Sequence, residues 1–152
     1  MRQMPTHRIT ETVARLCIEA NYELGDDVIA ALQRAVQQEE SPQGRDGRLC
    51  LLENARLAAG RTAPLCQDCG VAVVFVELGQ DVHRVGGDLN DAIAEGVRQG
   101  YAQGYLRRSM VWQPFSARVN TKDNTPPVIY GDVVPGDRLR LIVAPRAAAA
   151  RT

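Results

Sequence analysis

Apolar residues recur at helical spacing along the first part of the chain. One stripe covers residues 10–24 and predicts an amphipathic helix. A second stripe covers residues 28–36 and follows a pair of aspartates that can cap it, and a third predicts a helix over residues 47–59. The polar segment 37–46 contains proline and glycine and is expected to be a loop. The chain therefore begins with three predicted helices.

The period then changes from helical to extended. Val71–Val76 is a continuous run of β-favouring apolar residues, which is typical of a strand buried on both faces. A turn at residues 79–81 leads to a second short strand, Val82–Val85, and these two strands are expected to form a hairpin. Residues 128–130 and 139–143 predict two further strands.

A fourth helix is predicted to begin after Asp88, which can cap it. Apolar residues recur every four positions from Leu89 to Tyr105, and glycines share this spacing at positions 96, 100 and 104. Each glycine within a helix costs about 1 kcal/mol relative to alanine. We therefore expect another element to approach the backbone of this helix closely along the glycine line. The irregular stretch that follows residue 108 is expected to be an ordered, functional loop.

These elements predict an α+β fold. N-terminal helices are followed by a small mixed or antiparallel sheet with one long packed helix. Hydrophobic residues make up 45% of the 152 residues and charged residues 24%, which is the composition of one globular domain. We expect residues 1–146 to form this domain and residues 147–152 to be a low-complexity, alanine-rich tail.

Charge and hydropathy narrow the class of protein. Basic and acidic residues balance at 18 each, so no nucleic acid or anionic membrane is expected as a partner. No run reaches the roughly 18 apolar residues needed to span a bilayer, and the N-terminus lacks the apolar core of a signal peptide. We expect a cytoplasmic protein.

In a reducing compartment, cysteines are more often buried thiols or metal ligands than disulfides. Cys17 and Cys50 lie in predicted helices, where packing is their expected role.

The most informative short motif is Cys66-Gln67-Asp68-Cys69, which lies between the third helix and the first buried strand. A thiolate is a soft ligand for iron–sulfur clusters or zinc, and a carboxylate and an amide stand directly beside it. Taken alone, two cysteines at this spacing also occur in zinc sites and in thiol-redox motifs. The motif therefore indicates metal or thiol chemistry without choosing between them.

The surroundings of the motif make it more specific. Eight segments in unbroken order resemble the N-terminal part of the iron–sulfur-dependent class I fumarate hydratases and tartrate dehydratase alpha subunits. They are Leu52–Ala55, Pro64–Asp68, Ala72–Val82, Ala92–Tyr101, Tyr105–Ser109, Arg118–Thr121, Asp123–Pro126 and Val134–Asp137. Ordered similarity over most of the chain is much stronger evidence for a family than the cysteine motif alone.

The resemblance implies an iron–sulfur-dependent hydro-lyase. Its cofactor is expected to be a [4Fe-4S] cluster held by three cysteines, with the fourth iron open as a Lewis acid that binds substrate. The expected reaction is reversible hydration of a small dicarboxylate, with fumarate and malate as the first choice and tartrate as the second. The expected protein partners are a second copy in a homodimer, a beta subunit or domain, or both.

The resemblance also assigns roles to individual residues. It makes Cys66 the first cluster ligand, and it places Gln67 and Asp68 beside the substrate, with Asp68 as the catalytic residue. Arg107 corresponds to an arginine that binds a substrate carboxylate through a charge-assisted pair.

Asn120 and Thr121 are expected to shape the same substrate pocket. Arg108 directly follows Arg107, and adjacent side chains point in different directions, so we expect Arg108 to face solvent.

Two departures from the family pattern affect these expectations. Cys69 stands where the family usually has threonine. The chain also ends at Thr152, before the region in which the family carries its other two cluster cysteines, so we expect a truncated member that is inactive alone. Two other hypotheses remain. One is a non-catalytic module for dicarboxylate binding or subunit interaction, and the other is a zinc or thiol-redox module that uses Cys66 and Cys69.

Overall fold

The computed structural model describes residues 2–61 and 63–146, and the predicted tail at 147–152 lies outside the described residues. The chain divides into two compact units. The helical unit is Asn21–Cys66, and the sheet unit joins the described residues of Met1–Ala20 and Gln67–Thr152. Cys66 is the last residue of the helical unit, and Gln67 is the first residue of the second segment of the sheet unit.

The helical unit contains α2 (Asp26–Gln38) and α3 (Pro42–Ala59). Gly25 occupies the N-cap position of α2, and the two aspartates predicted to cap it lie instead in its first turn. Acidic side chains in a first turn still favour the helix, because the helix dipole is positive at this end. In the described ranges of both units, no helix has the length and apolar character needed to cross a membrane.

Helix α3 begins earlier than the sequence pattern predicted. The loop expected over residues 37–46 ends at Ser41, whose hydroxyl accepts a hydrogen bond from the Gly44 backbone N–H at 3.4 Å. Pro42 follows at the first helical position, where its missing N–H carries no penalty. Serine followed by proline is thus a helix start here rather than a loop signal.

Two predictions about buried cysteines had different outcomes. Cys17 is fully buried, as expected. Cys50 is exposed, so its predicted packing role is wrong. The leucines on either side of it, Leu49 and Leu51, are also exposed, since α3 buries Ala55 and Ala58 instead.

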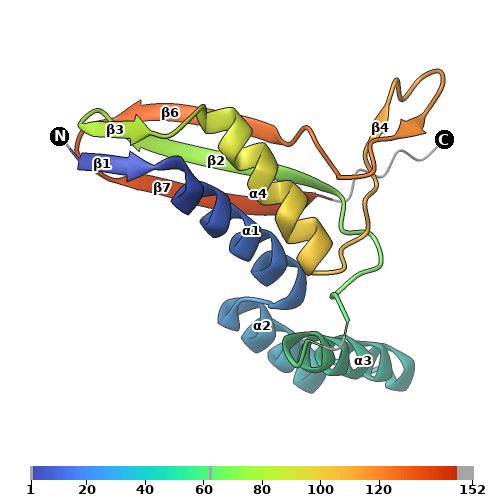
Figure 1. Ribbon diagram of the computed structural model, residues 1–152. Helices are drawn as coiled ribbons and strands as arrows, with labels where there is room; N and C mark the ends of the chain where they lie inside the picture. The colour runs from blue at the N-terminus through green and yellow to red at the C-terminus, as the bar shows by residue number, and fades with distance from the viewer. Residues whose placement is uncertain (1, 62, 147–152) are drawn as a thin grey trace. The chain divides into compact units, whose positions relative to one another are not determined.

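The sheet unit is built around a mixed sheet of three strands in the order β6-β2-β7 (Figure 1). The central strand β2 (Val71–Gly79) pairs in parallel with β6 (Val128–Val134) and antiparallel with β7 (Leu139–Arg146). Val74 and Val76 are buried on one face of β2. On the opposite face Val73 is buried but Phe75 is 42% exposed, so the predicted burial on both faces holds only in part. The predicted α+β class is confirmed.

The predicted hairpin is wrong. Strand β3 (Val82–Val85) does not pair with β2 but runs parallel to β1 (Arg2–Pro5), a strand that the sequence pattern did not predict. The backbone N–H of Arg2 also donates to the Asp81 carbonyl at 2.8 Å. The cause is competition for strand edges, because β6 and β7 occupy both edges of β2 and leave none for β3.

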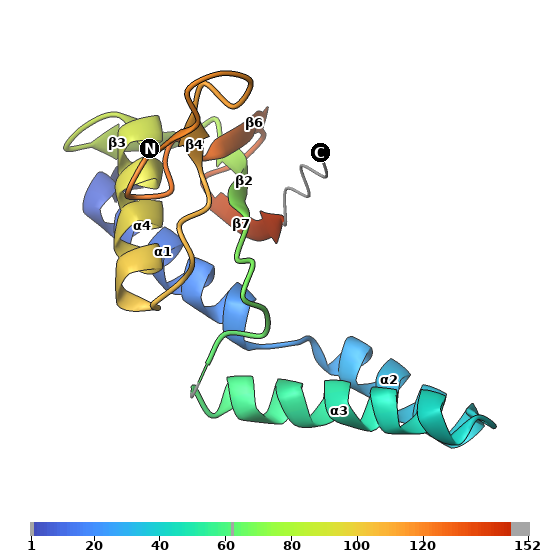
Figure 2. The ribbon, with the colours of Figure 1, turned by 90° about the vertical axis from the view of Figure 1, so that its right-hand side faces the viewer.

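Two long helices, α1 (Thr6–Tyr22) and α4 (Leu89–Gln103), lie side by side on one face of this sheet (Figures 1 and 2). Their contact follows the glycine line predicted from the sequence. A Cβ atom added at Gly96 would lie 2.7 Å from the Thr10 carbonyl oxygen, and one added at Gly100 would lie 2.7 Å from the Ala14 carbonyl oxygen. The expected close approach of another element is confirmed, and that element is α1.

Asp88 caps α4 as predicted, and its loss should destabilise the sheet unit. Its carboxylate accepts hydrogen bonds from the backbone N–H groups of Asn90 at 2.7 Å and Asp91 at 3.2 Å. Replacing Asp88 with alanine removes both acceptors and is expected to lower the free energy of unfolding by about 1 kcal/mol. Asp88→Asn keeps a capping acceptor and should lower the free energy of unfolding by only a few tenths of that amount. Urea denaturation of both variants checks this, and equal losses would contradict capping as the cause.

Candidate functional site

The backbone just before Cys66 is anchored within the helical unit. The N–H of Leu65 donates to the Asn21 carbonyl at 2.8 Å, and the Leu65 carbonyl accepts from the Asn54 side-chain amide at 2.9 Å. Cys66 follows directly, and its side chain is exposed. Asn54 lies in one of the segments that resemble the family, but its role in holding this loop was not predicted.

Gln67 and Asp68 begin the second segment of the sheet unit. Gln67 is exposed, and Asp68 is half-buried. One oxygen of the Asp68 carboxylate, Oδ1, accepts from the Gly70 N–H at 3.2 Å and from the Ser109 hydroxyl at 3.4 Å. The first of these bonds closes a tight turn, and the second ties Asp68 to a segment about forty residues later in the chain.

Cys69 has a structural role in this turn. Its side chain is buried, and its Sγ accepts a hydrogen bond from the Arg107 backbone N–H at 3.3 Å. The Tyr101 hydroxyl donates to the carbonyls of Cys69 at 2.9 Å and Gly70 at 3.2 Å. Burial, followed by the nearby Cys17, Cys69 and Asp68, raises the pKa of the Tyr101 hydroxyl above its usual value.

The two neighbouring arginines differ in their contacts. The side chains of Arg107 and Arg108 are both exposed. The Arg108 guanidinium donates to the Lys122 carbonyl at 2.9 Å. In the described ranges, no acceptor is bound to the Arg107 guanidinium, although the backbone of Arg107 is fixed by Cys69.

Asn120 ends β5 (Val119–Asn120), which pairs antiparallel with β4 (Val111–Trp112), and Thr121 directly follows β5. Both ends of the Asn120 amide are used, since it donates to the Arg108 carbonyl at 2.8 Å and accepts from the Lys122 N–H at 2.7 Å. The Thr121 N–H donates to the Met110 carbonyl at 3.0 Å. The Thr121 hydroxyl is buried and has no hydrogen-bond partner among the described residues.

Asn124 is a site residue whose role was not predicted. Its side chain is fully buried. Its Oδ1 accepts from the N–H groups of Ser109 at 2.8 Å and Met110 at 3.1 Å, and its Nδ2 donates to the Gly70 carbonyl at 3.0 Å. The sequence contained one signal for it, an asparagine inside an irregular segment that resembles the family, but this signal does not reveal its partners.

The same loop is tied to α4 through Asp123. Its carboxylate accepts from Arg98 Nε at 3.1 Å and from both the backbone and the hydroxyl of Thr125. Burial raises the pKa of Asp123, but the hydrogen bonds from Thr125 and Arg98 outweigh this effect and hold the pKa below its usual value. Asp123 is therefore an ionised structural anchor rather than a proton donor.

The described residues do not by themselves fit an iron–sulfur cluster. Within residues 2–61 and 63–146, no three histidine, cysteine or acidic side chains come together as a metal site. Cys66 offers an exposed thiol, whereas the thiol of Cys69 is buried and accepts a hydrogen bond from Arg107. The zinc or thiol-redox hypothesis therefore gains no support from Cys69.

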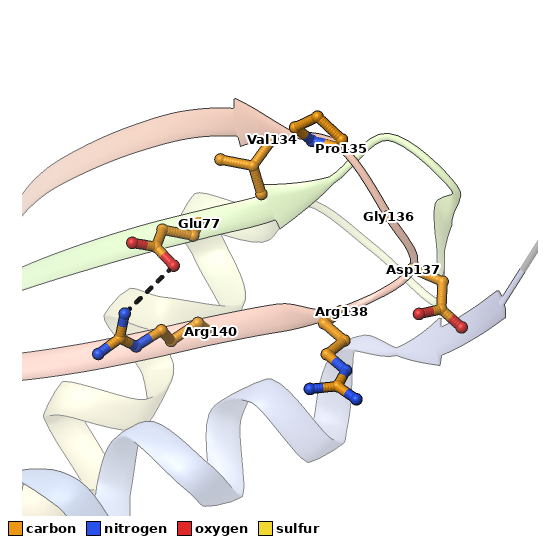
Figure 3. Close-up of a pocket in the computed structure, with 7 residues that line it drawn as sticks. All are labelled: Glu77, Val134, Pro135, Gly136, Asp137, Arg138 and Arg140. Carbon is orange, nitrogen blue, oxygen red and sulfur yellow. Dashed lines mark ion pairs between the residues drawn. The ribbon is translucent and has the colours of Figure 1, made fainter.

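A cavity of about 320 Å³ lies elsewhere on the sheet unit, at the ends of β2, β6 and β7 (Figure 3). Glu77 and Arg140 form an ion pair across it at 3.5 Å. The residues that line this cavity are Glu77, Val134, Pro135, Gly136, Asp137, Arg138 and Arg140. None of the predicted site residues is among them, so this cavity is separate from the candidate site.

Comparison with known proteins agrees with the resemblance. The chain is 32% identical over 118 residues to the putative L(+)-tartrate dehydratase subunit alpha of Methanocaldococcus jannaschii, covering 77% of this chain and 41% of that protein. It is 27% identical over 137 residues to the L(+)-tartrate dehydratase subunit alpha of Escherichia coli strain UTI89, covering 88% of this chain and 44% of that protein. The chain thus spans less than half the length of these curated relatives. The sequence model for fumarate hydratase (Fumerase) matches residues 10–150. The chain belongs to the fumarate hydratase (Fumerase) family.

Proposed function

We propose that this chain forms part of an iron–sulfur-dependent hydro-lyase that reversibly hydrates a small dicarboxylate, either fumarate and malate or tartrate. One observation carries the proposal. The turn that holds Asp68 is bonded directly to the segment that holds Arg107, through Cys69 Sγ at 3.3 Å and Ser109 Oγ at 3.4 Å. A carboxylate suited to proton transfer and a guanidinium suited to carboxylate binding are thereby held on adjoining segments.

Each predicted residue has a role in this proposal. Arg107 binds one substrate carboxylate, because its guanidinium is exposed whereas that of Arg108 is engaged by the Lys122 carbonyl. Asp68 is the catalytic residue, and Gln67 contacts the substrate beside it. Asn120 and Thr121 shape the pocket wall. The buried Thr121 hydroxyl lacks a partner among the described residues, and a bound polar group would offset that cost.

The cofactor and the partners are part of the same proposal. Cys66 is one ligand of a [4Fe-4S] cluster, and the other ligands come from outside the described residues. The relatives are named alpha subunits, which supports a beta subunit as partner, and a second copy of the chain is the other candidate. We propose a cytoplasmic location, since the four cysteines suit a reducing compartment.

Arg107→Ala is expected to weaken dicarboxylate binding by roughly 10- to 100-fold, because a charge-assisted hydrogen bond contributes about 1.5–3 kcal/mol. Isothermal titration with fumarate, malate and tartrate measures this. Arg107→Lys keeps the charge but loses the planar fork, and it should recover only part of the affinity.

Arg140→Ala is the matched control. It removes the same charge from the same unit, but Arg140 pairs with Glu77 in the separate cavity of Figure 3. The Arg140→Ala variant should bind the dicarboxylates with the same affinity as the unmodified chain. If Arg107→Ala and Arg140→Ala lose the same amount of dicarboxylate affinity, the loss is caused by the change in net charge, and the proposed role of Arg107 is contradicted.

A further inference from the structure

We propose that Asn124 is a positioning residue, whose buried amide fixes Asp68 and Arg107 relative to each other. This inference rests on the proposed function of those two side chains. Asn124 itself is fully buried and cannot contact substrate. It acts through the backbone of the two segments that carry them.

The contacts of Asn124 bridge these segments. Its Nδ2 holds the carbonyl of Gly70, at the end of the Asp68 turn. Its Oδ1 holds the N–H groups of Ser109 and Met110, which follow Arg107 along the chain. One short side chain therefore connects two stretches of backbone that are separated by about forty residues in sequence.

Two of the residues that Asn124 holds, Gly70 and Ser109, also contact the Asp68 carboxylate. Gly70 gives its carbonyl to Asn124 and its N–H to Asp68. Ser109 gives its N–H to Asn124 and its hydroxyl to Asp68. The resulting ring of four hydrogen bonds fixes the orientation of Asp68 only if Asn124 keeps both ends of its amide in place.

The chemistry of the position favours asparagine. The backbone φ of Asn124 is +62°, in the left-handed region that asparagine tolerates better than most residues. The side chain must also donate on one side and accept on the other. Aspartate keeps the shape and the acceptor but lacks the donor, and alanine lacks both.

Thiol labelling distinguishes positioning from general stabilisation. Cys69 is 3% exposed and lies in the turn, whereas Cys17 is 0% exposed and packs where α1 meets α4. After the exposed Cys50 and Cys66 have been blocked, mass spectrometry follows labelling at the two buried thiols. In Asn124→Ala, labelling of Cys69 should accelerate roughly 10-fold or more relative to Cys17. If both thiols accelerate by the same factor, Asn124 has only a global structural role and the inference is overturned.

Two further variants keep the test decisive. Asn124→Gly removes the same amide without straining the left-handed backbone, so it should also accelerate labelling of Cys69 relative to Cys17, and this variant serves if Asn124→Ala does not fold. Thr10→Val is the matched control, since it removes a hydrogen bond to the Ala92 carbonyl, 2.9 Å long, between α1 and α4. It should not accelerate Cys69 relative to Cys17.

Dicarboxylate titration links the result to function. Asn124→Ala should bind fumarate, malate or tartrate roughly 10-fold or more weakly than the unmodified chain, and Thr10→Val should bind equally well. Undiminished affinity in Asn124→Ala would overturn the inference. If instead the proposed function is wrong, the unmodified chain should bind no dicarboxylate. Labelling of Cys69 in Asn124→Ala should still accelerate relative to Cys17 in that case.

Discussion

Gly96→Ala is expected to lower the free energy of unfolding of the sheet unit by roughly 1–2 kcal/mol. The added Cβ would lie 2.7 Å from the Thr10 carbonyl oxygen and 2.7 Å from Val13 Cβ. Both atoms belong to α1 at its contact with α4, so the clash cannot be relieved by rotating a flexible side chain. The overpacking cost exceeds the gain of about 1 kcal/mol that alanine brings to a helix. Urea denaturation followed by circular dichroism measures the difference.

Gly47→Ala is the matched control for this substitution. Gly47 is also within a helix, α3, but a Cβ added there meets nothing within 4 Å. Alanine should therefore stabilise the helical unit, by up to about 1 kcal/mol. If Gly96→Ala were as well tolerated as Gly47→Ala, the close contact between α1 and α4 would be refuted.

Features that depend on neighbouring residues were predictable from the sequence. The cap, start and glycine line of α4 are all encoded within one stretch of chain, and each was confirmed. Strand β2 was recognisable for the same reason, because its apolar residues are consecutive, although its predicted burial on both faces fails at the exposed Phe75. The predicted end of α4 was wrong, since Tyr105 continues the apolar spacing but lies beyond the C-cap Gly104 in a left-handed conformation and is exposed.

Features that depend on distant residues were not predictable in the same way. The pairing of β3 with β1 joins residues about eighty positions apart, and nothing local in either short strand specifies it. A hairpin was the natural local alternative for β3. It fails because β6 and β7 occupy both edges of β2, and that competition is visible only in the assembled sheet.

The candidate site shows the same division. The family resemblance selects Cys66, Asp68 and Arg107, which carry reactive groups, and the roles proposed for them remain predictions. It does not reveal the amide of Asn124 or the hydroxyl of Tyr101, because their hydrogen bonds reach across the fold to Cys69 and Gly70. Residues that do chemistry leave a motif in sequence, whereas residues that hold them in place are defined by non-local contacts.

Alkaline pH is expected to destabilise the sheet unit through Cys17. Burial raises the pKa of this thiol from 9.0 to about 12 in the folded chain. Below pH 9 the thiol is protonated in both the folded and the unfolded chain, so burial of the neutral thiol contributes its full share to the free energy of unfolding. Between pH 9 and about 12 the unfolded chain loses this proton and the folded chain retains it, which favours unfolding by roughly 1.4 kcal/mol per pH unit. The raised pKa of the buried Tyr101 hydroxyl acts in the same direction above pH 10.0.

Cys17→Ala tests this mechanism, because it removes the titrating group from the core. At neutral pH it should lower the free energy of unfolding by about 1 kcal/mol, since a small buried side chain is lost. Its stability should then fall less steeply than that of the unmodified chain between pH 9 and 11, while Cys50→Ala, which removes an exposed thiol, should leave the slope unchanged. Urea titrations at several pH values give the slopes directly. If all three proteins lose stability in parallel, ionisation of the Cys17 thiol does not drive alkaline unfolding, which leaves the buried Tyr101 hydroxyl as the next group to test.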